Sequence, residues 1–306
     1  MVWIYYPVMA IITQLQGGLG NQLFQYATAR TLALLQHQAL LLDDQWYAQS
    51  YEQVTPRQVQ LQELSIVGQI QTCVPIKAPR RIRKILQSVL PISPFVLKEK
   101  KDKIYDPRIK NAPAFKNQDL YLMGYWQSYK YFESIRLQLL QETKAKKPLH
   151  THYQKYLEQI ENSPNAVMVH IRRGDYVHLP VVAQVHGALP ITYYAQAMQS
   201  MIAQCPSAPF FVFSDDLAWA KDHLPYQDVI QNTITFIQSV SMEHAVVQEL
   251  ALMRSCQHHI IANSSLSWWG AWLCENPEQH VICPSRWMGD RRLSLDDLLP
   301  PNWQRI

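Results

Sequence analysis

Short apolar runs and stretches with helical periodicity alternate along most of this chain. Near the start, an apolar run at 8–15, a helical pattern at 21–36 and a second apolar run at 39–43 predict a strand, a helix and a strand. Further along, strands are expected at 166–171, 209–214, 233–237, 258–262 and 280–283, and helices at 192–204, 217–223, 242–255 and 267–274. Strands and helices that alternate in this way predict an α/β fold with a parallel sheet covered by helices on both faces.

The middle region, 45–150, is less regular because prolines interrupt it. An apolar run at 120–127 predicts a buried strand, and a helix is expected at 132–144. Three residues at the end of that strand are expected to face a cleft: Tyr125, Trp126 and Gln127. We expect an N-terminal α/β domain at 1–148, a C-terminal Rossmann-like domain at 149–285 and a C-terminal tail at 286–306.

The composition is that of a globular protein with a large core. The 306 residues are enough for two domains, with 48% hydrophobic and 17% charged residues. A net charge of +4 is too small to indicate nucleic acid, but it suits an anionic small molecule. The five scattered cysteines form no C-x-x-C pair, which favours reduced thiols of a cytoplasmic protein. The apolar start lacks the basic part of a signal peptide and is shorter than the ~20 residues of a membrane span.

Polar clusters follow three of the expected strands. The first holds His170, Arg172, Arg173 and Asp175; the second Ser214, Asp215 and Asp216; the third Asn263, Ser264, Ser265 and Ser267. Open parallel sheets bind ligands outside the carboxyl ends of their strands. Three such clusters therefore predict a nucleotide site that faces a second domain.

The residue types indicate roles in that site. Arg172 can neutralise a diphosphate, and Ser264 and Ser265 can contact the same oxygens beside the N–H groups of the next helix. Asp215 can accept two hydrogen bonds from a guanine. The alternatives are structural: helix capping by the acids and serines, and arginines that pair with nearby carboxylates.

A glycine-rich loop, Gln16-Gly-Gly-Leu-Gly-Asn-Gln22, joins the first strand to the first helix. Free N–H groups at a helix start favour anions, so Gly18 and Gly20 are candidate donor contacts. The amides of Asn21 and Gln22 could bind a sugar hydroxyl or a diphosphate. The loop is neither G-x-G-x-x-G nor a Walker loop, which disfavours a dehydrogenase or an ATPase. A tight turn with no ligand is the alternative.

The sequence offers no obvious metal site. It contains no Asp-x-Asp pair, which suggests that arginine and helix dipoles stabilise a leaving diphosphate. Adjacent residues of a strand point to opposite faces, so His258 and His259 form a poor chelate and are expected to pack in the core. We expect neither a metal nor another cofactor.

Several segments, taken together, resemble the bacterial α-1,2-fucosyltransferases. They are Gly17-Gly-Leu-Gly-Asn-Gln-Leu-Phe-Gln-Tyr-Ala27, His170-Ile-Arg-Arg-Gly-Asp-Tyr176, Phe211-Val-Phe-Ser-Asp-Asp216 and Asn263-Ser-Ser-Leu-Ser-Trp-Trp-Gly-Ala-Trp272. The resemblance implies a GT-B-type fold with two facing Rossmann-like domains. It also implies metal-free, inverting transfer of fucose from GDP-fucose to O2 of a terminal β-galactose on an oligosaccharide.

The resemblance implies residue roles as well. Arg172 would hold the β-phosphate, His170 would lie near the guanosine, and Asp215 would read guanine. Ser264 and Ser265 would line the diphosphate, with Asn263 and Ser267 beside them. Asn21 would lie near the reacting sugar, so Arg172, Asp175 and Asn21 are the catalytic candidates. Acceptor contacts by Tyr125, Trp126 and Gln127 are the least supported of these roles.

Some alternatives stay open. Asp175 and Glu249 are candidate general bases, although a dissociative transition state favours no dedicated base. Another GDP-sugar or acceptor, or a non-catalytic nucleotide- or sugar-binding module, is the rival function. The basic runs at 80–84 and 98–103 are expected to be solvated, with peripheral contact at the inner membrane face as the alternative.

Overall fold

The computed structural model shows two compact units. It describes residues 9–49, 57–73, 94–100, 104–107, 109, 119–178, 187–225, 233–288 and 294–306. Among the described residues, unit 1 ends at Thr143 and unit 2 begins at Lys144. The basic run at 80–84 lies outside the described residues.

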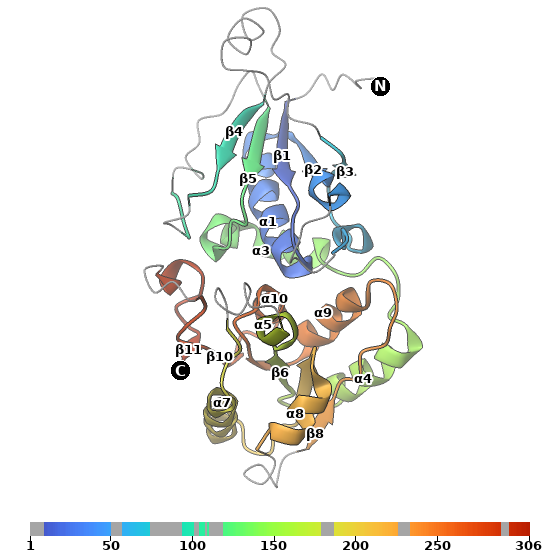
Figure 1. The fold of residues 1–306 in the computed structure, drawn as a ribbon, viewed down its shortest axis with the longest axis vertical. Helices are drawn as coiled ribbons and strands as arrows, with labels where there is room; N and C mark the ends of the chain where they lie inside the picture. Colours follow the sequence, from blue (N-terminus) through green and yellow to red (C-terminus); the bar gives the residue numbers. More distant parts are fainter. Residues whose placement is uncertain are drawn as a thin grey trace, which may run out of the picture. The chain divides into compact units, whose positions relative to one another are not determined.

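Unit 1 is built on a five-stranded parallel sheet in the order β3-β2-β1-β5-β4 (Figure 1). The strands are β1 (Ala10–Gln14), β2 (Ala39–Asp43), β3 (Gln69–Gln71), β4 (Phe95–Lys98) and β5 (Leu120–Met123). The helices are α1 (Leu19–Gln36) and α3 (Arg136–Glu142), with 3-10 turns η1 (Gln45–Ala48), η2 (Leu61–Glu63), η3 (Tyr129–Tyr131) and η4 (Glu133–Ile135). The predicted strand-helix-strand unit at the start of the chain is confirmed.

Helix α1 is buried for most of its length because it lies along the sheet. Leu23, Phe24 and Ala27 are fully buried. The helix ends at His37, which adopts a left-handed conformation with φ 53° and donates its N–H to Leu34 O. The predicted helix at 132–144 is shorter than expected, because η4 replaces its first turn and α3 begins only at Arg136.

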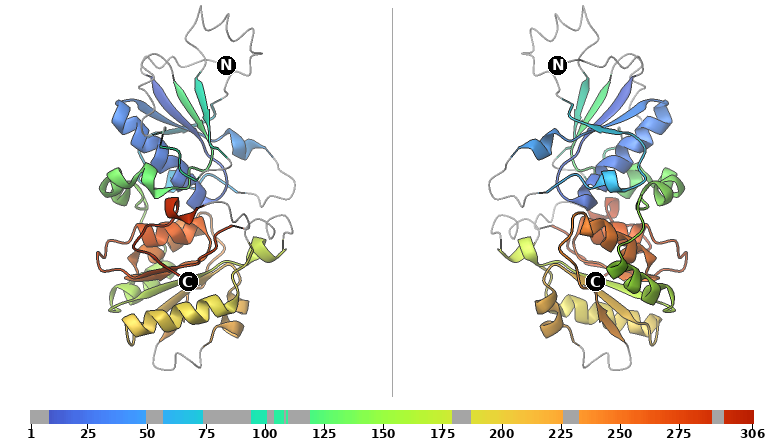
Figure 2. Two further views of the ribbon diagram at one scale, coloured as in Figure 1. Left: turned by 90° about the vertical axis from the view of Figure 1, so that its left-hand side faces the viewer. Right: turned by 90° about the vertical axis from the view of Figure 1, so that its right-hand side faces the viewer.

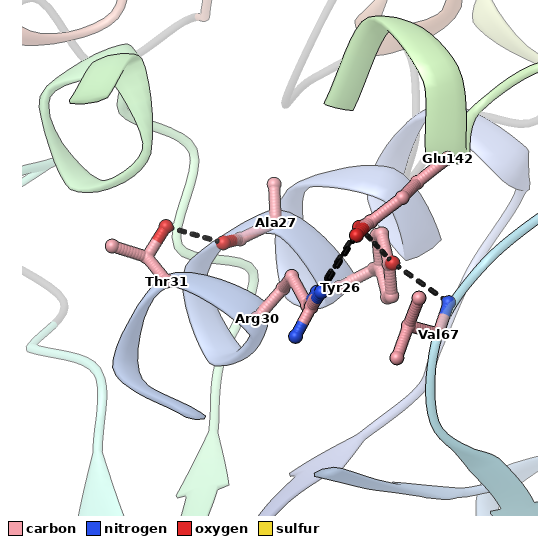
Figure 3. Close-up of polar contacts among 6 residues, drawn as sticks. All are labelled: Tyr26, Ala27, Arg30, Thr31, Val67 and Glu142. Carbon is pink, nitrogen blue, oxygen red and sulfur yellow. Dashed lines mark hydrogen bonds and ion pairs between the residues drawn. The ribbon is translucent and has the colours of Figure 1, made fainter. Parts of the chain in front are cut away.

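A buried polar network fastens α1 to α3 (Figure 3). Tyr26 OH donates to Glu142 Oε2 at 2.5 Å and accepts from the N–H of Val67 at 3.0 Å. Arg30 forms an ion pair with Glu142, with Nη2 2.7 Å from Oε1, and both side chains are largely buried. Burial, reinforced by the hydrogen bond to Glu142, raises the pKa of Tyr26 far above its usual value. The phenol therefore stays protonated and donates to the carboxylate.

Unit 2 contains a six-stranded parallel sheet in the order β11-β10-β9-β6-β7-β8 (Figure 1). The strands are β6 (Val167–Ile171), β7 (Phe210–Ser214), β8 (Ile234–Phe236), β9 (His258–Ile260), β10 (Val281–Cys283) and β11 (Gln304–Arg305). The helices are α4 (Thr151–Glu161), α5 (Gly174–His178), α7 (Ile191–Gln204), α8 (Leu217–His223), α9 (Ala245–Ser255) and α10 (Ser265–Trp272), with the 3-10 turn η6 (Leu295–Asp297). The predicted alternation of strands and helices is confirmed, whereas the sequence pattern did not predict α4 or α5.

The two faces of the second sheet carry different helices. Val167, Val169 and Ile171 of β6 pack against α7, in a fully buried cluster. Helices α9 and α10 lie together on the other face (Figure 2). Gly270 permits their close approach, because a Cβ there would lie 2.9 Å from Cβ of Met253. The alternation of inward residues along β6 thus separates the α7 side from the side of α9 and α10.

The C-terminal segment belongs to this sheet, which corrects the expectation of a tail at 286–306. Strand β11 pairs with β10, and Ile306 N–H donates to Cys283 O at 3.0 Å. Trp303 packs on Trp268, with ring centroids 5.6 Å apart, and the indole N–H of Trp268 donates to Leu298 O. The segment therefore closes one edge of the sheet and covers part of the core.

Two further expectations concern cysteines and membrane spans. All five cysteines lie in the described residues and are free thiols, and four of them are buried. Within the described part of the chain, no helix has the length and apolar character needed to cross a bilayer.

Candidate functional site

The end of β6 carries the central polar cluster of unit 2. Arg172 leaves the strand and forms an ion pair with Asp215, with Nη1 2.8 Å from Oδ2. Its guanidinium also lies over the ring of Tyr176, 5.6 Å from the centroid. Helix α5 begins directly afterwards at Gly174, so Arg172 is fixed at the carboxyl end of a buried strand.

Asp215 holds this loop through both carboxylate oxygens. Oδ1 accepts the backbone N–H of Arg173 at 2.8 Å, and Oδ2 pairs with Arg172. A Cβ on Gly174 would lie 2.7 Å from Oδ2, so only glycine lets the carboxylate come this close. The structure therefore gives Asp215 the role of orienting Arg172; a contact with guanine would have to use its remaining lone pairs.

The neighbouring arginine has a different role. Arg173 stacks on Trp219 at 3.7 Å from the ring centroid, and its Nε is 3.6 Å from Asp216 Oδ2. Asp216 also caps α8 by accepting the N–H of Trp219 at 3.1 Å. Asp216 is thus a capping residue, as the structural alternative proposed, and Arg173 packs over the start of α8.

His170 is a buried neutral imidazole beneath this cluster. Burial lowers its pKa to about 4; Asp215 opposes the shift and Arg172 adds to it. Within the described residues its Nδ1 has no hydrogen-bond partner. His259, on β9, is fully buried and donates from Nε2 to Met253 O at 3.0 Å. Its pKa is also lowered to about 4, chiefly by burial.

The lowered pKa values of these two histidines predict that the folded protein loses stability in acid. The unfolded chain binds a proton at each near pH 6.5, whereas the folded chain does so only near pH 4. Protons therefore favour unfolding within this window, at up to ~1.4 kcal/mol per pH unit for each imidazole. Urea unfolding between pH 7 and pH 5 should show the decline, and His259→Gln should make it shallower. Parallel curves for the two proteins would contradict this prediction.

The start of α10 holds two kinds of polar residue. Ser267 is fully buried and donates to Ala262 O or Ser264 O, and Asn263 is buried with Nδ2 donating to Gly187 O and Trp287 O. In this structure the N–H groups of Asn263 and the hydroxyl of Ser267 therefore donate to backbone carbonyls, and contact of these residues with the sugar nucleotide stays a prediction. Ser264, the N-cap residue, makes no capping bond, and Ser265 is partly exposed. Ser264 and Ser265 remain the anion candidates at this helix start.

Two acids were candidate general bases. Glu249, on α9, accepts a hydrogen bond from Ser239 Oγ at 2.5 Å. Burial raises its pKa; Ser239 and Arg172 oppose the shift, while Asp215 adds to it. Glu249 is therefore within electrostatic reach of the Arg172–Asp215 pair. Asp175 lies in α5, but its side chain is outside the described part of the chain.

In unit 1, the glycine-rich loop is held by buried amides. Gly17, at φ +76°, presents its carbonyl to Gln22 Nε2 at 3.1 Å and to Tyr47 OH at 2.8 Å. Gln22 is fully buried, donates also to Gln58 O and accepts the N–H of Gln60. Both N–H groups of the Gln22 amide and its oxygen thus bind backbone groups of unit 1, and its contact with the sugar nucleotide stays a prediction.

The loop glycines differ in their surroundings. Gly17 approaches Asn21 so closely that a Cβ would lie 2.7 Å from Asn21 Nδ2. Gly18 is the N-cap of α1, and a Cβ there would meet no atom within 4 Å, whereas Gly20 is buried in the first turn. Gly18 is therefore the loop glycine that leaves room for a ligand near the helix start.

The residues predicted to face a cleft after β5, Tyr125, Trp126 and Gln127, differ in their surroundings. Trp126 is only 1% exposed and packs against Tyr131, which corrects the expectation that it faces a cleft. Tyr125 is 41% exposed, and Gln127 Nε2 donates to Asn21 Oδ1 at 2.8 Å. The carboxyl ends of β1 and β5 thus bring together Asn21 and Gln127.

Sequence reasoning missed Tyr47 and Glu99. Tyr47 lies in an irregular stretch without periodicity. Glu99 follows β4 within a run of lysines that was interpreted as a solvated face, yet it accepts the N–H groups of Tyr125 and Trp126. The run also contains Asp102, so nothing in its sequence singled out Glu99.

One group of described side chains could offer metal ligands: Cys205, His258 and His280. The His258 and His280 rings are stacked with centroids 5.1 Å apart, and His258 Nδ1 accepts the N–H of His280. A metal-bound imidazole normally donates from its second nitrogen, so His258 does not suit coordination through Nε2. The burial of His258 and His259 agrees with the packing role predicted for them.

The part of the chain that carries these motifs matches a known protein family. The sequence pattern of glycosyl transferase family 11 matches residues 10–306. An alpha-1,2-colitosyltransferase of Escherichia coli is 29% identical over 97% of this chain and 98% of its own length. The O-antigen biosynthesis glycosyltransferase WbnK of Escherichia coli is 30% identical over 92% and 95%. The galactoside alpha-(1,2)-fucosyltransferase 1 of Homo sapiens is 24% identical over 89% of this chain and 65% of its own length.

Among solved structures, a mutant of Arabidopsis thaliana FUT1 in complex with GDP has a TM-score of 0.50 at 10% identity. The similarity covers 89% of this chain and 70% of that chain. At this identity the likeness concerns the fold alone. Two α/β units with parallel sheets, as found here, are the GT-B type, and the predicted fold class is confirmed.

Proposed function

Because the chain belongs to glycosyl transferase family 11, we propose that it transfers L-fucose from GDP-fucose to O2 of a terminal β-galactose on an oligosaccharide. The observation that carries this proposal is the fixed position of Arg172, which Asp215 orients at the end of β6. The names of an α-1,2-colitosyltransferase and a galactoside α-(1,2)-fucosyltransferase among its relatives support the linkage and the acceptor.

On the donor side, Arg172 would bind the diphosphate by charge-assisted hydrogen bonds. Ser264, Ser265 and the N–H groups at the start of α10 would contact the same oxygens. These donors stabilise the negative charge that develops as the diphosphate departs. Positive charge from arginine and helix dipole supports transfer without a metal ion.

The reaction would be a single in-line displacement with inversion at the anomeric carbon. The galactose O2 forms a bond to that carbon while its bond to the diphosphate oxygen breaks, and GDP leaves with the electron pair. The hydroxyl proton passes to water or to the departing phosphate. If a residue takes this proton, Asp175 and Glu249 are the candidates, and a pH–rate profile of each variant would reveal the lost acidic limb.

On the acceptor side, the candidates reduce to Tyr125 and Gln127, and Asn21 joins them through its contact with Gln127. The Oδ1 of Asn21 accepts a hydrogen bond from Gln127, so its Nδ2 would be the group that donates to a sugar. Tyr125 offers an exposed ring, on which a sugar could pack. Trp126 supports them from the core. We expect the protein to act in the cytoplasm, with peripheral contact at the inner membrane face as an additional prediction.

A second donor follows from the relatives. The similarity to the Escherichia coli colitosyltransferase covers almost the whole chain, so GDP-linked colitose is the rival to GDP-fucose. Competition between the two GDP-sugars for transfer to one labelled acceptor would separate them. A non-catalytic binding module would instead bind GDP tightly and show no turnover with any acceptor in a panel.

The test is release of GDP from GDP-fucose, with and without lactose, in excess EDTA. Lactose-dependent release is expected, and it would support the donor, the galactoside acceptor and metal independence together. Release that requires added Mn²⁺ would overturn the metal-free mechanism. Release without lactose dependence would keep the donor and contradict the acceptor.

A further inference from the structure

Glu99 follows β4 and contacts the turn after β5, which carries Gln127, the hydrogen-bond partner of Asn21. We infer that Glu99 is a positioning residue for the acceptor side, which acts through Gln127 on Asn21. The inference rests on the proposed role of Asn21 and Gln127 near the reacting sugar. Its structural part concerns only contacts within unit 1.

The carboxylate of Glu99 holds two consecutive backbone N–H groups. Oε2 accepts from Tyr125 at 2.7 Å and Oε1 accepts from Trp126 at 2.8 Å. The backbone N–H of Glu99 donates to Met123 O at 2.8 Å, which extends the ladder between β4 and β5. Glu99 is therefore fixed at its own backbone, and its side chain fixes the turn beyond β5.

Gly124 makes this contact possible. A Cβ there would lie 2.3 Å from Cβ of Glu99, so a larger residue would displace the carboxylate. The carbonyl of Gly124 accepts from Gln25 Nε2 at 3.2 Å, and Gln25 Oε1 accepts the N–H of Gln16 at 3.0 Å. The turn after β5 is thus tied to the glycine-rich loop after β1.

The held turn contains a strained residue. Trp126 has φ 56°, a left-handed conformation that is unfavourable for a non-glycine residue. The hydrogen bonds that Glu99 accepts from the N–H groups of Tyr125 and Trp126, together with the burial of the indole, offset this strain. The reversal at Trp126 directs Gln127 to Asn21, with Nε2 2.8 Å from Oδ1.

Loss of the Glu99 carboxylate should therefore relax this turn without breaking the sheet. The ladders of β1, β4 and β5 do not depend on the side chain. Asn21 would lose the contact that orients its amide, and misplacement of a reacting group by about 1 Å can cost on the order of 10²-fold in rate. The binding of GDP, which the proposal assigns to unit 2, should remain unchanged.

The matched control is Asp119→Asn. Asp119 Oδ1 also accepts a backbone N–H in this sheet, from Ala10 at 2.9 Å, but it lies at the opposite, amino ends of β1 and β5. If the Asp119 carboxylate has only a structural role, Asp119→Asn should lower the melting temperature and leave transfer intact. The comparison separates loss of stability from loss of positioning.

The experiment is a double-mutant cycle of Glu99→Gln and Gln127→Ala, with kcat/KM for lactose, GDP affinity and melting temperature as readouts. Each single variant is expected to lower kcat/KM about 10–10²-fold and to keep GDP affinity within about twofold. The kcat/KM of the double variant should be no lower than that of the more impaired single variant, because both substitutions act on the same contact. Multiplicative losses, or transfer by Glu99→Gln at the wild-type rate, would overturn the inference.

A readout that needs no acceptor completes the test. In ¹⁵N-labelled protein, the side-chain amide protons of Gln127 should be protected from exchange, and Glu99→Gln should remove this protection while Asp119→Asn keeps it. Absence of transfer to lactose by the wild-type protein would contradict the proposed function alone. Unchanged protection of Gln127 in Glu99→Gln would contradict the role of Glu99, whatever the acceptor.

Discussion

The rate of GDP release is expected to fall about 10²–10³-fold when Arg172 is replaced by alanine, because one charged donor to the leaving group is lost. Asp215 already orients the guanidinium at 2.8 Å, so little rearrangement is needed to reach a phosphate. Arg172→Lys should recover only part of the rate, because an ammonium lacks the planar fork that matches two phosphate oxygens. Initial rates with GDP-fucose and lactose measure both effects.

The fold should survive this substitution, since the side chain of Arg172 is partly exposed. Arg254→Ala is a suitable control, because Arg254, in the last turn of α9, is also a partly buried arginine paired with a carboxylate, that of Glu275, and has no proposed role in binding the diphosphate. It should keep the wild-type rate. Turnover by Arg172→Ala at the wild-type level would refute the role of arginine in departure of the diphosphate.

The largest effect on stability is expected for Glu142→Leu. This change leaves the guanidinium of Arg30, only 15% exposed, without its carboxylate and removes the acceptor of Tyr26 (Figure 3). Breaking a buried ion pair by removal of one partner costs about 3–5 kcal/mol. Urea unfolding should show the loss in the transition of unit 1, which contains all three side chains.

Two comparisons identify the cause of this loss. Arg30→Met combined with Glu142→Leu should recover much of the stability, because no unpaired charge remains. Arg305→Ala breaks an exposed pair with Asp296 and should cost less than about 1 kcal/mol. Equal losses for Glu142→Leu and for the double variant would show that volume, not charge, dominates.

Periodicity predicted the repeating framework because buried parallel strands are continuous apolar runs. Strand β2 was predicted with its observed ends, Ala39 and Asp43. Strands β3, β4 and β11 escaped prediction, because they are edge strands of two to four residues, too short to show a clear period, and β3 and β11 carry polar side chains. Their places depend on contacts with distant parts of the chain.

The sequence predicted where polar residues gather, but not the partners of the individual side chains. Polar residues do cluster at the ends of β6, β7 and β9, where the sequence pattern placed them. Gln22, Asn263 and Ser267 nevertheless donate to backbone carbonyls. An amide or hydroxyl near a strand end has the same chemistry whether it faces a ligand or a loop, so sequence alone does not distinguish the two. Glu99 was hidden for the same reason, since only its partners reveal that it points inward.

The position of β11 has a consequence for synthesis of the chain on the ribosome. Unit 1 has all its strands once Met123 has emerged and its last helix once Glu142 has emerged. The second sheet, in contrast, cannot be completed until Gln304 and Arg305 are free to pair with β10. Domains that finish earlier in the chain generally fold earlier during translation. Nascent unit 2 should therefore expose an edge of β10 for much longer than unit 1 exposes any of its strands, and chaperones that hold open sheet edges would act mainly on the second half.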